Sequence, residues 1–126
     1  MRAVDTNVVV RLVTHDDAKQ LAAAEAFVST GAWVSHVVLV EVVWVLESVY
    51  GRDPAEIIAT IEVLLNHEHL TLQDAGTVSA ALDQFRRRPA VGFSDCLVLE
   101  IARKAGRLPL GTFDRHLGKL AGATRL

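Results

Sequence analysis

The sequence has few of the features that mark secreted, membrane or polyanion-coating proteins. It contains one cysteine, Cys96, so no disulfide can form within the chain, which fits a reducing compartment. Aromatic residues make up only 6% of its 126 residues, and 13 basic residues stand against 15 acidic ones, a formal net charge of −2. This balance argues against binding to polyanions through bulk charge, so any contact with nucleic acid must come from local patches.

No apolar run is long enough to cross a membrane. The run from Val37 to Leu46 is half of the roughly 20 residues that a span needs, and it contains Glu41. The apolar start of the chain is interrupted by Asp5, Asn7 and Arg11, and no small-residue cleavage site follows it directly. We therefore expect a cytoplasmic protein that binds no membrane.

Hydrophobic residues make up 51% of the chain and charged residues 22%, which is typical of a globular protein. No repeat, low-complexity tract or linker divides the sequence. Its length suits one domain over residues 1–126 that buries a substantial core.

Strand-like and helix-like segments alternate along the chain. Short apolar segments predict strands, and longer segments with helical spacing, acidic starts or glycine stops predict helices. We expect strands in segments 1–5, 32–35, 69–73, 108–113 and 123–126, and helices in segments 16–31, 36–51, 53–68, 74–88, 93–106 and 114–120. This order predicts an α/β fold, a three-layer α/β/α sandwich with a mainly parallel central sheet.

Four acids fall near the carboxyl ends of predicted strands, where such folds bind ligands. They are Asp5, Glu41, Asp95 and Asp114. Taken singly, the three aspartates are more often helix caps than catalytic groups. Glu41 differs, because it lies past any cap position in an apolar run with no basic residue within a helical turn. A buried, unpaired carboxylate is costly, so Glu41 either reaches solvent, is neutral or has a cationic partner. A hard cation such as Mg²⁺, shared with the other acids, would relieve that cost.

Four motifs in order resemble those of PIN domains, and more closely the VapC-type ribonuclease toxins of bacterial toxin–antitoxin pairs. They are "VDTNVVVRLV", "VEVVWVLE", "FSDCLVLEIARKAG" and "LGTFDRHL". The resemblance covers essentially the whole chain, and the four acidic positions do not depart from it.

The resemblance implies a Mg²⁺- or Mn²⁺-dependent endoribonuclease that forms a homodimer and is inhibited by a small cognate antitoxin. It implies that the four acids form the metal site, with Asp5 and Asp95 as the most direct ligands. It further assigns supporting roles to three polar residues, Asn7, Ser94 and Thr112. The expected reaction is hydrolysis of an RNA phosphodiester bond by metal-bound water.

Basic residues near these motifs are candidate contacts for RNA phosphates. Arg115, beside Asp114, is the first choice, followed by His116 and Lys119. We expect the run of arginines at 86–88 to be a solvated helix end, where cations suit the helix dipole.

Two other functions remain as alternatives. A receiver-like phosphoacceptor module would share the architecture, but it needs paired acids after the first strand and a lysine after the last, and neither is present. A catalytically silent PIN-like binding module is the other, and the presence of all four acids argues against it. No base-reading element is evident, so the sequence leaves DNA open as a substrate.

Overall fold

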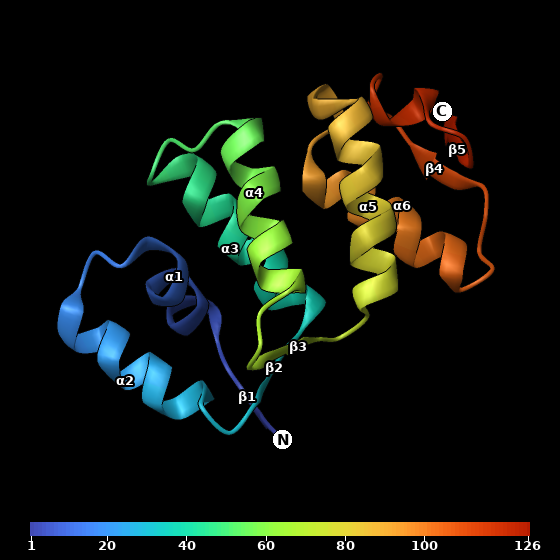
Figure 1. Ribbon diagram of the computed structural model, residues 1–126. Helices are drawn as coiled ribbons and strands as arrows, with labels where there is room; N and C mark the ends of the chain where they lie inside the picture. The colour runs from blue at the N-terminus through green and yellow to red at the C-terminus, as the bar shows by residue number, and fades with distance from the viewer. The chain divides into compact units, whose positions relative to one another are not determined.

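The computed structural model describes all 126 residues as two compact units, Met1–Ala75 and Gly76–Leu126 (Figure 1). The elements of the first unit, in order, are β1 (Arg2–Ala3), α1 (Thr6–Thr14), α2 (Ala18–Val28), β2 (Ala32–Val34), α3 (His36–Ser48), α4 (Pro54–Leu65) and β3 (Leu70–Leu72). Its three strands are parallel, in the order β1-β2-β3. Arg2 pairs with Ala32, and Ala32 pairs with Leu70.

The second unit also carries parallel strands. Its elements are α5 (Ala75–Arg87, which starts at the boundary), the 3-10 helix η1 (Pro89–Val91), α6 (Phe93–Lys104), β4 (Leu110–Thr112), the 3-10 helix η2 (Leu117–Lys119) and β5 (Ala123–Arg125). β4 and β5 pair in parallel, with Leu110 opposite Ala123. The Phe85 and Phe93 rings meet edge to face in its core, with centroids 6.2 Å apart.

The predicted α/β class with parallel strands is confirmed, and each predicted segment contains an element of the expected kind. The strands form two parallel sheets, one in each unit. Two elements were not predicted, the helix α1 and the short η1. The prediction that residues 1–126 form one domain stays a prediction. None of the helices combines the length and apolar character that a membrane crossing requires.

The segment 36–51 is rich in β-branched residues, yet it forms a helix. Ser35 caps α3 by accepting the backbone N–H of Val38 at 3.1 Å. The buried residues of the helix follow the spacing i, i+3, i+4, i+7, namely Leu39, Val42, Val43 and Leu46. This spacing places the apolar residues on one face, and their burial outweighs the strand propensity of valine.

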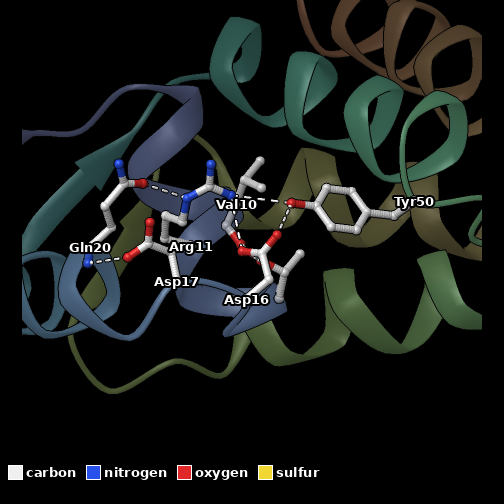
Figure 2. A network of polar contacts seen from close by, with 7 residues as sticks. Val10, Arg11, Asp16, Asp17, Gln20 and Tyr50 are labelled. Atoms are coloured by element: carbon white, nitrogen blue, oxygen red, sulfur yellow. Dashed lines mark hydrogen bonds and ion pairs between the residues drawn. The ribbon is translucent and has the colours of Figure 1, made fainter.

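A polar network fixes the turn between α1 and α2 against the end of α3 (Figure 2). Arg11 Nη1 donates to Asp16 Oδ1 at 3.1 Å and to Tyr50 Oη at 3.2 Å, and Arg11 Nε donates to Gln20 Oε1 at 2.6 Å. The Tyr50 hydroxyl in turn donates to Asp16 Oδ2. Because Asp5 is the N-cap of α1 and Glu41 belongs to α3, this network holds together the two helices that position these acids.

Candidate active site

Asp5 stands two residues after β1 and opens α1. Its Oδ1 accepts a hydrogen bond from the Val8 N–H at 3.2 Å, which makes it the N-cap of the helix. A cap satisfies an N–H that would otherwise lack a partner, and it typically contributes about 1 kcal/mol. Asp5 is exposed and its Oδ2 makes no hydrogen bond. The capping role therefore leaves one oxygen available to a ligand.

Glu41 lies in the second turn of α3 and contacts the start of α1. The Thr6 hydroxyl donates to Glu41 Oε2 at 2.9 Å. Since Thr6 directly follows Asp5 in the chain, this bond holds the Glu41 carboxylate near the N-cap of α1. The first unit thus brings Asp5 and Glu41 to the same place, beyond the carboxyl ends of β1 and β2.

The expectation that Glu41 is an unpartnered acid in apolar surroundings is wrong. Glu41 is exposed, because the buried face of α3 is formed by its neighbours Val42 and Val43 and by Leu39. Residues adjacent in the sequence of a helix point in different directions, so the apolar run does not enclose the carboxylate. Solvent and the Thr6 hydroxyl satisfy Glu41, and its presence alone does not require a cation.

Asp95 is the acid that capping does not explain. It lies in the first turn of α6, whose N-cap position is Gly92 and has no side-chain cap. Its carboxylate is partly buried and makes no hydrogen bond or ion pair. Burial, and then the nearby Asp114 carboxylate, raise the pKa of Asp95. Its ionised form is therefore disfavoured until a cation or a hydrogen-bond donor arrives.

Asp114 stands two residues after β4, in a turn built from hydrogen bonds. Its backbone N–H donates to Thr112 Oγ1 at 2.9 Å, and its Oδ1 accepts from the Leu117 N–H at 2.7 Å. Backbone hydrogen bonds, first from Leu117 and then from His116, lower the pKa of Asp114, and the nearby charge of Arg125 acts in the same direction. Asp95 and Asp114 therefore form a pair with opposite shifts, in which Asp114 stays ionised most readily.

The predicted supporting residues lie beside these acids. Asn7 is exposed in the first turn of α1, and Ser94 is half-buried next to Asp95; neither side chain makes a hydrogen bond. The Thr112 hydroxyl oxygen accepts the hydrogen bond from the Asp114 N–H. Arg115 is exposed and pairs with no acid.

Two residues near the acids were not singled out from the sequence. Thr6 binds Glu41, and the only sequence signal for it is the motif "DTN", which places a hydroxyl next to Asp5. Arg125 acts on Asp114 because β5 pairs with β4, with Thr112 opposite Arg125. No local pattern reveals that pairing, since it is set by the register of two parallel strands that are separated by residues 113–122.

The donors at these positions are oxygens, which suit hard cations such as Mg²⁺ and Mn²⁺. Burial, and then the charges of Asp95 and Glu100, raise the pKa of the Cys96 thiol to about 11, which disfavours the thiolate that a nucleophile requires. No group of three or more His, Cys, Asp or Glu side chains is placed to hold a metal. Each unit supplies one acidic pair, and a pair with free oxygens suits a hydrated Mg²⁺, which keeps several of its waters.

Comparison with known protein families matches one family over nearly the whole chain. The PIN domain family matches residues 2–123. Comparison with curated proteins gives no significant match.

Proposed function

This chain belongs to the PIN domain family, and from that premise we propose that it is a Mg²⁺-dependent endoribonuclease. PIN domains are typically nucleases and generally use divalent metal ions. We assign the catalytic carboxylates to Asp5, Glu41, Asp95 and Asp114. The observation that carries the proposal is Asp95, a partly buried acid without a hydrogen bond that lies close enough to Asp114 for their charges to interact.

The residues fit a divalent ion because Asp5, Glu41 and Asp95 each keep at least one carboxylate oxygen without a hydrogen bond. Glu41 uses Oε2 for Thr6, Asp5 uses Oδ1 for Val8, and Asp114 uses Oδ1 for Leu117. Asp95 uses neither oxygen. Mg²⁺, and Mn²⁺ in its place, would lower the pKa of a bound water and offset charge on the phosphate oxygens.

The side chains of the protein have the remaining roles in binding the ion, the water and the RNA. Asp95 and Asp5 are the most direct ligands, and the Thr6 hydroxyl orients the Glu41 carboxylate. Glu41 and Asp114 are the two acids that are not assigned as most direct ligands, and either carboxylate could accept a proton from a water molecule. Thr112 holds the Asp114 turn, Asn7 and Ser94 offer polar atoms to substrate or water, and Arg115 offers a cation to an RNA phosphate.

We further propose that the nuclease is the toxin of a toxin–antitoxin pair. The four motifs of the sequence support this role, and so does an apolar surface on α3. Val37 and Trp44, seven residues apart on one face of the helix, are 68% and 64% exposed. Exposed large apolar residues on one face suit a protein partner, either a second copy of the chain or a small antitoxin. Co-expression with the product of the adjacent upstream reading frame tests this, and it predicts a stable complex and loss of ribonuclease activity.

The direct test of the enzyme is cleavage of a labelled single-stranded RNA. Wild type should cut the RNA in Mg²⁺ and not in EDTA, and Asp95→Asn should be inactive while remaining folded. Asp83→Asn, a change of the same kind at an exposed position of α5, is the matched control and should keep full activity. A protein that binds RNA and never cleaves it would instead support the silent PIN-like module. Equal activity of Asp95→Asn and wild type would overturn the assignment.

A further inference from the structure

The second unit contains a groove lined by three cations. Arg87, at the end of α5, and Arg88, which follows it, face Lys119 of η2 across a groove of about 420 Å³. The rest of its lining is Gln84, Leu120 and Ala121. Figure 1 shows the end of α5 close to the segment that follows β4. No acid lines the groove, so its charge is wholly positive.

The cations of the groove lack acidic partners. Arg87 Nε donates only to the backbone oxygen of Asp83, at 3.3 Å, and the side chains of Arg88 and Lys119 are exposed and pair with no carboxylate. Arg86, which does not line the groove, is the arginine of this run that pairs with the Asp83 carboxylate, at 3.0 Å. Like charges that converge without a counter-charge repel each other, and an anion between them relieves the repulsion.

The groove is tied to a proposed catalytic acid. Lys119 belongs to η2, the short helix whose first turn is anchored on Asp114 through the Leu117 N–H at 2.7 Å and the Gly118 N–H at 3.0 Å. The Lys119 N–H donates to the His116 oxygen at 3.2 Å, which continues the same turn. Lys119 is the last residue of η2, and the first residue of η2 bonds directly to Asp114, so one short hydrogen-bonded turn connects the groove to this acid.

We propose that this groove binds a backbone phosphate of the RNA substrate, close to the phosphate that is cleaved. The inference rests on the proposed function, because it names a substrate contact for the same site. Arginine forms paired hydrogen bonds with phosphate, and lysine adds a point charge. No aromatic residue lines the groove to stack a base, so the contact positions the strand and carries no sequence preference. The run 86–88 is exposed, as a solvated helix end would be, and the proposal adds a phosphate contact for Arg87 and Arg88.

The test is binding of a labelled single-stranded RNA, measured by fluorescence anisotropy in EDTA over a range of NaCl concentrations. EDTA stops metal-dependent cleavage, so binding is measured apart from catalysis. Arg88→Gln and Lys119→Gln should each weaken binding by about threefold to tenfold. Each should also reduce the slope of log K against log [NaCl] by about 0.7, the contribution of one single-strand phosphate.

The matched control is Arg107→Gln, which removes the same charge from an exposed position of the same unit outside the groove. It should leave the affinity and the salt slope close to those of wild type. Arg88→Lys should retain most of the binding, since it keeps the charge. Melting temperatures identify any variant that has lost its fold, which is not expected at these exposed sites.

The outcomes separate this inference from the proposed function. If Arg88→Gln and Lys119→Gln lower the salt slope no more than Arg107→Gln does, the groove is not a phosphate site, even if wild type cleaves RNA. If these two variants lower the salt slope more than Arg107→Gln does, while wild type never cleaves RNA in Mg²⁺, the phosphate site is supported and the proposed nuclease activity is overturned. Absence of any RNA binding by wild type overturns both.

Discussion

Neutralising Asp95 should stabilise the protein without metal and remove its response to metal. In EDTA at pH 7, the Asp95 carboxylate is partly buried, unpaired and close to Asp114, so its charge opposes folding. Interactions between charges near a surface are worth about 0.2–1 kcal/mol. For a chain of this length, Asp95→Asn should raise the melting temperature by roughly 1–4 °C. The change removes charge without changing side-chain size.

The sign follows from the direction of the pKa shift. A carboxyl whose pKa is raised in the folded state favours folding while it is protonated, and this contribution is lost as pH rises through the folded pKa. The advantage of Asp95→Asn should therefore be full at neutral pH. It should shrink as pH falls toward the ordinary aspartate pKa of about 3.9.

Magnesium should reverse the order of the two proteins. A ligand present at tenfold its Kd stabilises the folded state by about 1.4 kcal/mol, which corresponds to roughly 5 °C here. Wild type should gain this stability in Mg²⁺, and Asp95→Asn should not.

Thermal unfolding in EDTA and in Mg²⁺ measures both the stability without metal and the gain from Mg²⁺. Asp83→Asn is the control, and it should gain as much stability from Mg²⁺ as wild type does. Loss of stability in Asp95→Asn without metal would show that the acid is structural. An equal gain in Mg²⁺ for both proteins would show that the ion does not bind at Asp95.

Three further predictions concern residues around the acids. Thr6→Val removes the hydroxyl that donates to Glu41, so it should lower kcat in an RNA cleavage assay by about tenfold or more, with Thr6→Ser restoring most of it; an unchanged kcat would contradict the positioning role. Tyr50→Phe removes the hydrogen bond that most lowers the pKa of Asp16, so its cost in urea unfolding should be largest at neutral pH and shrink as pH falls through the folded pKa; a cost that does not vary with pH would refute this. The Cys96 thiol, buried and with a pKa of about 11, should resist a thiol reagent at pH 8 until the chain unfolds, and rapid labelling of folded protein would contradict its placement.

Much of the fold was predictable because its signals are local. Asp53 and Pro54 predict the start of α4 from the sequence, and the structure shows the full capping box between Asp53 and Glu56. The helix α3 was harder to predict, since its valines favour a strand. The length of the segment favoured a helix, and this prediction is confirmed. The pairing of β4 with β5 was not predictable, because strand register depends on contacts between distant segments.

The candidate acids were found from their places after strands, but their environments were not. Sequence neighbours suggested that Glu41 was buried, whereas helical geometry turns it toward solvent and the Thr6 hydroxyl. Asp95 looked like an ordinary helix cap, and it is instead the acid without a hydrogen bond. The burial of a carboxylate and its hydrogen-bond partners depend on three-dimensional packing, which cannot be read from its neighbours in the sequence.

Binding of the ion at these carboxylates can be measured by titration with Mn²⁺, followed by the loss of the free-ion electron paramagnetic resonance signal. Wild type and Asp83→Asn should bind Mn²⁺ alike, Asp5→Asn and Asp95→Asn should each weaken binding by at least about tenfold, and Mg²⁺ should compete. Undiminished Mn²⁺ binding by Asp5→Asn and Asp95→Asn would contradict the claim that these carboxylates hold the catalytic ion.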